Sequence, residues 1–469
     1  MARQENDHTQ SSVFSEGIDR RVERFTESIS CDRRLYEVDI RASLAHARML
    51  GDVGILTDDE FRQIEDTLIA IRREIEDGIF EFNVEFEDIH QHVEHALIEK
   101  LGDAGRKLHL ARSRNDQVVT DLRLWIRDAI DRIDRRLLDV QAAFVGRCDD
   151  DFDIILPGYT HLQRTQPVLA PHYWLAYCEK FQRDRERLRD CRKRVNVLGL
   201  GAATLAGTSL PIDPTRTAEY LGFERIAANS LDVVSDRDFV LEAAFGLVEI
   251  ALHLSTLAEE WILWTTAEFN FLHPSQSFCT GSFIMPQKVN PDVLELIRGK
   301  TARVLGSLQT LLVLTKGLPL AYNRDLQEDK PPIFDAFDTV ETVLSLVVPL
   351  VENAVLQRES IRSRLDLAYL DATVLVEYLV GKNVSQRIAH GIVGRLVRTA
   401  MERNTPLAAL PLKVFHEIYH GFDYNVYEVL GSQNAVAAMK SYGSTAPDEV
   451  RRQIDFWKEK IDKDYRTIR

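Results

Sequence analysis

The sequence predicts an all-α protein whose centre is a bundle of long helices. The chain has 469 residues but only 23 glycines and 15 prolines, which fits long helices joined by short connections. Apolar residues recur at helical spacing through the middle of the chain, without an alternation of strands and helices or a series of β-hairpins. Hydrophobic residues make up 45% of the chain, which is enough for a large core.

The net charge argues against two kinds of binding partner, and the cysteines indicate the compartment. A formal charge of −15 argues against nonspecific nucleic-acid binding and against docking on anionic lipid. The polar N-terminus shows no secretory signal, and no apolar run approaches the ~20 residues of a membrane span. The five cysteines are scattered and form no CxxC pair, which indicates free thiols in a reducing compartment. We therefore expect a cytoplasmic protein without nucleic-acid or membrane partners.

Five long helices are predicted, at about 115–148, 171–198, 235–269, 291–317 and 332–355. The first contains no proline, and its apolar residues fall at helical spacing. The second carries a dense charge stripe from Arg183 to Arg194. The third should be on the order of 50 Å long at 1.5 Å per residue. Because the apolar stripes cover several faces, each helix should be buried against several neighbours.

Both ends of the chain differ from the middle. Residues 1 to about 17 are polar, and short helical patterns then alternate with polar breaks as far as about Leu101. Beyond about residue 360 the predicted helices become short again, and Pro406 and Pro411 interrupt the pattern. These features predict a smaller helical domain at the C-terminus.

The most informative polar segment runs from Gly281 to Pro291 and contains Ser282 and Lys288. Asn290 is a good N-cap and Pro291 suits a first helical position, so the segment should end at a helix N-terminus. Such an end carries partial positive charge and unpaired N–H groups, which favour a bound carboxylate. A hydroxyl beside an anion site indicates proton transfer on a small dicarboxylate. An ordinary loop before a capped helix is the alternative.

A second polar segment, residues 157–167, lies between a Pro-Gly turn and another proline. His161 in this segment is a candidate proton donor or acceptor near neutral pH. Thr160, Gln163 and Gln166 would then bind substrate oxygens. A polar connection between helices is the alternative interpretation.

Two more polar segments also allow two readings. Residues 111–117 offer two arginines, a hydroxyl and an amide, a set suited to carboxylates, although for this segment alone a polar helix start is the favoured interpretation. Residues 322–330 include Tyr322, Gln327 and Lys330, which could face a ligand or belong to a solvated loop.

Two further patterns predict neither a metal nor a cofactor. His90, His92 and His95 include a His90–Glu94 pair one helical turn apart, as zinc ligands would be, but no thiol or further ligand motif joins it. The glycine-rich segment 199–207 lacks the preceding strand of a dinucleotide site, so a helix-breaking loop is expected.

Taken together and in this order, the four polar segments resemble the fumarase/aspartase superfamily and, within it, the argininosuccinate lyase family. The resemblance covers nearly the whole chain. Its motifs are Ser28–Asp39, Glu87–His90, Ser113–Trp125, Gly158–Gln163, the Ser282 loop and Gly317–Lys330. The Ser282 loop marks the superfamily, whereas residues 112–117 and 322–330 point to the argininosuccinate branch.

The resemblance implies three helical domains, at 1–112, 113–362 and 363–469. It also implies a homotetramer whose central helices form a twenty-helix core. Each active site would take segments from three subunits, which explains how polar loops far apart in the sequence serve one pocket.

The reaction implied by the resemblance is cleavage of argininosuccinate into arginine and fumarate by an anti elimination, without a metal or organic cofactor. Ser282 matches the family's base, His161 its proton-transfer histidine and Glu295 the acidic partner of that histidine. Exchanged roles for Ser282 and His161 remain an alternative. Lys288 and the helix start at Pro291 would stabilise the alkoxide and the developing negative charge. The residues expected to bind substrate are Ser28, Arg114, Asn115, Thr160, Asn290, Tyr322, Gln327 and Lys330.

Three departures from the family pattern concern the amine half of the substrate. Phe283 replaces the usual second serine of the loop, and Val289 replaces a basic residue common in argininosuccinate lyases. The usual Trp-Gly-Gly-Arg-Phe near the N-terminus is replaced by Ser12–Gly17. A related C–N lyase acting on another N-substituted aspartate, in secondary metabolism or chelator degradation, is therefore an alternative. A non-catalytic relative is a third.

Overall fold

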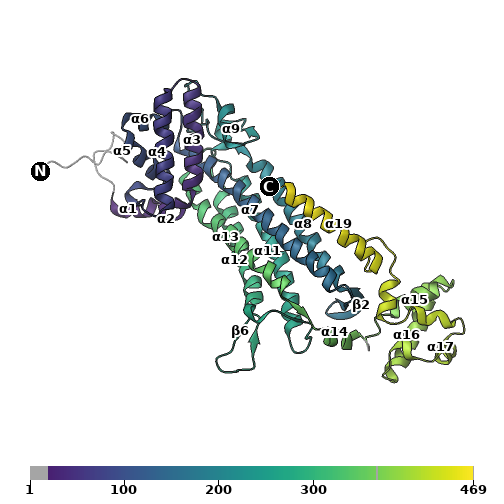
Figure 1. Ribbon diagram of the computed structural model, residues 1–469. Coiled ribbons are helices and arrows are strands. Elements are labelled where there is room, and N and C mark those ends of the chain that lie inside the picture. The colour runs from purple at the N-terminus through teal and green to yellow at the C-terminus, as the bar shows by residue number, and fades with distance from the viewer. Residues whose placement is uncertain (1–18, 366–367, 468–469) are drawn as a thin grey trace. The chain divides into compact units, whose positions relative to one another are not determined.

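The computed structural model describes residues 19–365 and 368–467 (Figure 1), so Ser12–Gly17 lies outside the described residues. Helices dominate, which confirms the predicted all-α class. The five long helices are α7 (Arg114–Asp150), α8 (Ala170–Val195), α11 (Asp238–Thr265), α12 (Asp292–Thr315) and α13 (Lys330–Glu352). Each begins and ends within four residues of its predicted bounds.

The chain divides into two compact units. The first comprises Met1–Arg132, Glu186–Val248 and Ala302–Thr339, and the second comprises Ile133–Arg185, Glu249–Thr301 and Val340–Arg469. Each long helix contributes residues to both units. The expected domain boundaries after residues 112 and 362 stay predictions.

Short helices complete the first unit. They are α1 (Arg20–Thr26), α2 (Ile29–Asp32), α3 (Tyr36–Asp52), α4 (Asp58–Glu76), α5 (Ile89–Leu101), α6 (Asp103–Arg106), α9 (Pro214–Leu221) and α10 (Ser230–Val233). A parallel pair, β3 (Val197–Leu198) and β4 (Arg225–Ile226), joins them. α3 and α4 lie side by side (Figure 1), and α4 starts at a capping box between Thr57 and Glu60. The buried residues Ile64, Leu68 and Ile71 turn one face of α4 to the core.

The second unit holds most of the strands and the C-terminal helices. The strands are β1 (Ile155–Thr160), β2 (Gln163–Leu169), β5 (Leu272–His273), β6 (Thr280–Gly281), β7 (Val289–Asn290) and β8 (Val355–Leu356). The helices are α14 (Arg358–Leu365), α15 (Ala372–Gly381), α16 (Gln386–Glu402), α17 (Leu412–Ile418), α18 (Ser432–Ala437) and α19 (Pro447–Thr467). A separate core that includes Leu375, Leu396 and Phe415 packs α15, α16 and α17 together.

Two features differ from the sequence predictions. Residues 157–167 connect α7 to α8, as one interpretation of the segment expected, but they do so within the antiparallel hairpin of β1 and β2, which was not predicted. Pro157, Pro167 and Leu169 lie on one face by their pairing and are buried, so the hairpin has an apolar side that stabilises it. Helix α19 has 21 residues, although only short helices were expected beyond residue 360. Its buried residues Val450, Ile454, Trp457 and Ile461 follow the helical period, so the signal was present in the sequence.

Helix α11 is long and apolar enough to span a membrane by length and composition, with a mean hydropathy of 1.6 over its most apolar window. It is the only such helix in the described residues. Because 56% of that window is buried inside the protein, α11 has the character of a core helix.

Candidate active site

One cavity of the first unit brings six of the predicted substrate-binding residues together. It has a volume of about 470 Å³. Its walls come from the residues around α2, the start of α5, the start of α7 and the segment leading into α13. The predicted residues in it are Ser28, Arg114, Asn115, Tyr322, Gln327 and Lys330. The other lining residues are Asp32, Glu87, Asp88, His90, Gln91, Val118 and Arg324.

Hydrogen bonds to nearby elements orient the polar side chains of the cavity. Ser28 Oγ donates to Asp32 Oδ2 across 2.6 Å. The amide of Asn115 donates to the Thr204 carbonyl across 3.0 Å. The Gln327 amide donates to two backbone carbonyls just before Ser28, at 3.2 and 3.3 Å. The structure therefore holds these side chains in place without a ligand.

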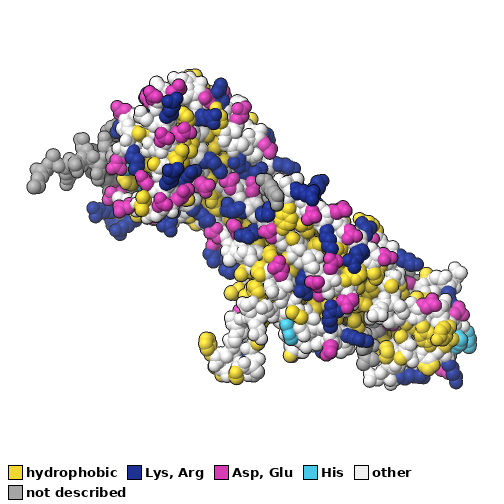
Figure 2. All heavy atoms as spheres, in the orientation of Figure 1, with side chains coloured by type: hydrophobic (Ala, Val, Ile, Leu, Met, Phe, Trp, Pro, Cys, Tyr) yellow, Lys and Arg dark blue, Asp and Glu magenta, His cyan; other side chains and the backbone are white. Residues whose placement is uncertain are grey.

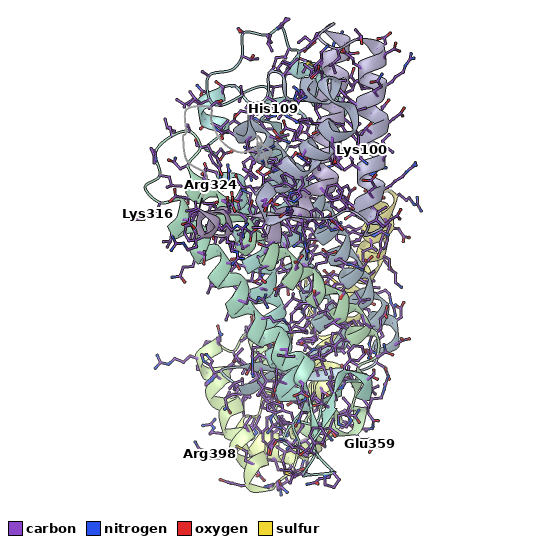
Figure 3. All side chains as sticks on the ribbon, turned by 90° about the vertical axis from the view of Figure 1, so that its left-hand side faces the viewer. Lys100, His109, Lys316, Arg324, Glu359 and Arg398 are labelled. Carbon is purple, nitrogen blue, oxygen red and sulfur yellow. The ribbon has the colours of Figure 1, made fainter. Side chains whose placement is uncertain are left out.

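Cationic and acidic groups share the cavity walls. Arg324, labelled in Figure 3, pairs with Glu87 at 2.5 Å, and Arg114 pairs with Asp88 at 3.2 Å. Burial raises the pKa of Asp32 to about 6, against the opposing effect of the nearby imidazole. A mixed set of this kind suits a ligand that carries both carboxylates and a cationic group.

Lys330 is the first residue of α13 and is almost fully buried. Its Nζ donates to the Leu326 carbonyl at 3.0 Å and lies 2.8 Å from an oxygen of Asp329. Burial lowers the pKa of Lys330, and the Asp329 carboxylate opposes that shift. Asp329 also forms an ion pair with Arg237, so one buried carboxylate balances two buried cations.

His161 lies at the tip of the hairpin in the second unit. His161 and Leu162 form the two-residue turn between the paired residues Thr160 and Gln163. Their φ angles are 53° and 56°, as a type I′ turn requires. Neither residue has the freedom of glycine, so the flanking strands must hold this strained backbone in place. The imidazole is exposed, where a ligand can reach it.

Ser282 begins the segment that joins β6 to β7, two strands paired through Gly281 and Val289. Its Oγ accepts hydrogen bonds from the backbone N–H groups of Ile284 at 3.3 Å and Met285 at 3.1 Å. Two donors directed at one hydroxyl oxygen favour its deprotonated form. Figure 2 shows apolar side chains at the tip of the segment that projects beside β6.

Lys288 and Glu295 lie on either side of the start of α12 and are both exposed. The helix begins at Asp292, one residue later than predicted. In the described part of the chain no hydrogen bond or ion pair joins Glu295 to His161, so their partnership stays a prediction. The predicted site residues of the second unit are Thr160, His161, Ser282, Lys288, Asn290 and Glu295.

Sequence reasoning did not assign the acidic and imidazole groups of the cavity. The Glu87–His90 motif contributed to the resemblance, but its side chains received no role. The signal for one of them was the N-cap position of Asp88, which opens α5. His109, labelled in Figure 3, lies 3.3 Å from Glu94, whereas His90 contacts other carboxylates, so the pair considered for zinc shares no site.

The glycine-rich segment 199–207 is a loop, as predicted, and it anchors the start of α7. The N–H groups of Gly201 and Ala203 donate to Asp116 Oδ2 at 3.0 and 2.7 Å. The loop thus fixes the helix that carries Arg114 and Asn115 into the cavity.

Comparison with known proteins assigns the chain to a family. A lyase family model matches residues 13–306, and a model of the argininosuccinate lyase C-terminal region matches residues 369–437. The argininosuccinate lyase of Rhodopirellula baltica is 59% identical over 97% of this chain and 99% of its own length. The chloroplastic argininosuccinate lyase of Arabidopsis thaliana is 47% identical over 96% and 87%.

Solved structures share the fold. An EDDS lyase in complex with formate superposes with a TM-score of 0.83 at 28% identity, covering 92% of this chain and 87% of that one. A class II fumarase from Schistosoma mansoni has a TM-score of 0.69 at 17% identity, over 82% and 88%. Together with the matched models and relatives, this similarity shows that the chain belongs to the argininosuccinate lyase family of C–N lyases.

Proposed function

We propose that this protein cleaves argininosuccinate into arginine and fumarate by an anti β-elimination of a C–N bond. The observation that carries the proposal is the cavity in which six predicted substrate-binding residues converge. It occurs in a chain that matches a named argininosuccinate lyase at 59% identity over almost its whole length.

Ser282 is the proposed base that removes the weakly acidic Cβ proton of the succinyl group. A hydroxyl is a poor base unless its alkoxide is stabilised. The N–H groups of Ile284 and Met285 supply that stabilisation at the oxygen itself. The exposed ammonium of Lys288, which follows on the same segment, adds positive charge.

His161 is the proposed proton donor to the leaving nitrogen, with Glu295 as its acidic partner once the site is assembled. The exposed turn that carries His161 lets the imidazole reach a substrate bound elsewhere. The carbanion formed by proton removal is an aci-carboxylate, so the site needs cations and N–H donors where its charge develops. The amide of Asn290 and the hydroxyl of Thr160 are the proposed additional contacts.

The proposed assembly is a homotetramer with composite active sites. Apolar side chains that are 46–66% exposed on α11 and α12 support an association of these helices with other subunits. They are Phe245, Leu252, Leu296, Leu305, Leu312 and Val313. In this assembly the serine and histidine segments of neighbouring subunits meet the cavity. We place the enzyme in the cytoplasm, without a metal, a nucleic acid or a membrane as partner.

Argininosuccinate is favoured over another N-substituted aspartate as the substrate. The chain is 59% identical to an argininosuccinate lyase but 28% identical to the structurally similar EDDS lyase. Six of the eight residues predicted to bind substrate also line one cavity, and the departures at Phe283 and Val289 affect none of these six.

The test is turnover of argininosuccinate by the purified protein, followed as fumarate formation in the ultraviolet. The reverse reaction with fumarate and a panel of amines provides the comparison. We expect adduct formation with arginine and none with ethylenediamine or simple alkylamines. Adduct formation with another amine, and no product with arginine, would reject argininosuccinate as the substrate.

A further inference from the structure

A cluster of ionisable side chains on α3, α5 and α7 lies buried beside the cavity. His90 Nδ1 is 2.8 Å from Asp39 Oδ1 and 3.1 Å from Asp121 Oδ2. All three side chains are at most 2% exposed. The Gln117 amide donates to the same Asp39 oxygen at 2.6 Å and fixes that carboxylate from a second side. The imidazole is therefore clamped between carboxylates of two neighbouring helices.

This setting favours the cationic form of His90. Burial by itself lowers the pKa of the imidazole, but the carboxylates of Asp39, Asp121 and Asp88 raise it to about 10. Asp39 Oδ2 and both oxygens of Asp121 accept no hydrogen bond among residues 19–365 and 368–467. Burial and the neighbouring Asp39 raise the pKa of Asp121 to about 7, and the imidazole opposes this shift. Burial acts on Asp39 in the same direction, but the imidazole and the Arg112 guanidinium hold the pKa of that carboxyl well below its usual range.

The second ring nitrogen of His90, Nε2, is the donor of this side chain that remains available to a ligand. His90 lines the cavity, and within the described chain Nε2 has no hydrogen-bond partner. The cluster also positions a neighbouring cation of the cavity, because Gln117 Oε1 accepts from Arg114 Nη1 at 2.6 Å. A cationic N–H in a cavity wall binds an anion more strongly than a neutral donor does.

We propose that His90 is a further substrate-binding residue, an imidazolium held by Asp39 and Asp121 whose Nε2–H donates to a carboxylate of the ligand in the cavity. The inference rests on the proposed lyase function and adds a contact that its predicted residues did not include. The carboxylate belongs either to the fumarate half or to the arginine half, and the experiment separates these sources.

A metal ion held by the same three side chains is the competing interpretation. One ligand atom from each of Asp39, His90 and Asp121 lies within 4.8 Å of the others. Nδ1 donates its proton to Asp39 in the arrangement described above, so it has no lone pair to offer a cation at that position. Measuring the metal content of the purified enzyme decides between a proton and a metal.

The key variants are His90→Asn and His90→Gln, each studied as the full-length assembly. The amide of asparagine can replace Nδ1 in its bond to Asp39 but leaves nothing at the position of Nε2. The longer glutamine can place a neutral donor near Nε2. His46→Asn is the matched control, because His46 is equally buried, bonds to the Leu110 carbonyl at 2.9 Å and does not line the cavity.

Fumarate and arginine are titrated separately into each protein by calorimetry near neutral pH. We expect His90→Asn to weaken the binding of one product by about ten- to a hundredfold, with His90→Gln in between and the control unchanged. The affected product identifies the half that His90 contacts. Unchanged affinity for both products in folded His90→Asn would overturn the proposal, as would stoichiometric metal that this variant loses.

A product-bound crystal structure of the unaltered enzyme provides a second test that does not depend on how the variants fold. We expect Nε2 within about 3.2 Å of a carboxylate oxygen of the ligand. A separation greater than about 4 Å contradicts the proposal. If the unaltered enzyme binds neither product and does not cleave argininosuccinate, the proposed function itself fails. If it is active but His90 makes no contact, only this inference fails.

Discussion

Replacing Asp329 by asparagine should destabilise the protein far more than removing a carboxylate from its surface. The Asp329 side chain is fully buried between Arg237 and Lys330, which are 2% and 6% exposed. Neutralising it leaves two buried cations without their counter-ion. Breaking a buried ion pair by removing one partner costs about 3–5 kcal/mol, and here the partner serves two cations. We therefore expect a loss of at least about 3 kcal/mol in the free energy of unfolding.

The change should also alter how stability depends on pH. Burial already lowers the pKa of Lys330, and Asp329 opposes this shift more strongly than Asp32 does. Without Asp329 the folded-state pKa falls further below the ordinary lysine value of about 10.4. The folded variant then binds fewer protons than the unfolded chain, so its unfolding free energy rises with pH up to that value. Urea unfolding at about pH 7.5 and 9.5, at one protein concentration, measures this slope.

Asp59→Asn is the matched control, because Asp59 pairs with Arg62 at 3.9 Å on the surface, where the side chains are 87% and 70% exposed. We expect this change to cost less than about 1 kcal/mol. Equal urea midpoints for Asp329→Asn and the control would show that Asp329 does not stabilise the two buried cations. If the urea midpoint of Asp329→Asn does not rise with pH, the folded-state pKa of Lys330 is not lowered in this variant.

Four further outcomes test the site and the assembly. Ser282→Ala should lower kcat by at least about a thousandfold with the oligomer intact by light scattering, and normal turnover would reject the serine as base. Gly158→Ala places a Cβ 2.7 Å from the Gln166 carbonyl oxygen, so the hairpin must shift, and kcat should fall about tenfold or more while the melting temperature changes little. Asp32 has a folded pKa of about 6, above its unfolded value, so its stabilising contribution at acid pH is lost as the pH rises from about 4 to 6. Asp32→Asn should accordingly raise the unfolding free energy near pH 7.5 by about 2 kcal/mol in urea titrations, whereas a lower value contradicts the pKa shift. Leu312→Asp, on an exposed apolar face of α12, should dissociate the assembly in sedimentation runs, and an unchanged oligomer would place the interface elsewhere.

The long helices could be predicted because their signal is local. Apolar residues at helical spacing and the absence of proline fix α7 to within two residues at each end. The start of α12 followed from an N-cap and proline pattern, which is equally local. The amphipathic period of α19 was equally regular, but the proline-broken segments before it favoured short helices throughout the C-terminal region.

The hairpin of β1 and β2 could not be predicted in the same way. A two-residue type I′ turn normally shows itself by Asn-Gly or Asp-Gly, whereas this turn consists of His161 and Leu162. Local propensity therefore contradicts the observed backbone, and the pairing of the strands overrides it. Strained residues of this kind concentrate at functional sites, so the missing turn signal was itself a hint of function.

The charged part of the cavity depends on tertiary structure, which a pattern in one segment does not encode. Asp39, His90 and Asp121 lie on three different helices, and each alone looks like an ordinary polar residue of an amphipathic helix. The His90–Glu94 spacing is that of a zinc pair, but the sequence analysis set it aside because no further ligand motif joins it. In the structure the neighbours of His90 are two carboxylates from other helices, and these favour its cationic form.

Two of the departures from the family pattern lie on one exposed loop. Phe283 and Val289 are both exposed on the segment between β6 and β7, and neither lines the cavity. The residues proposed to bind the substrate in the cavity lie instead on or beside α2, α5, α7 and the segment before α13. In the proposed assembly, however, the Ser282 segment of a neighbouring subunit meets the cavity, so Phe283 and Val289 would reach the substrate without lining the cavity of their own chain. A change at Arg114 or Lys330 would remove a proposed contact, whereas the effect of Phe283 and Val289 on the amine half is read from the amine panel.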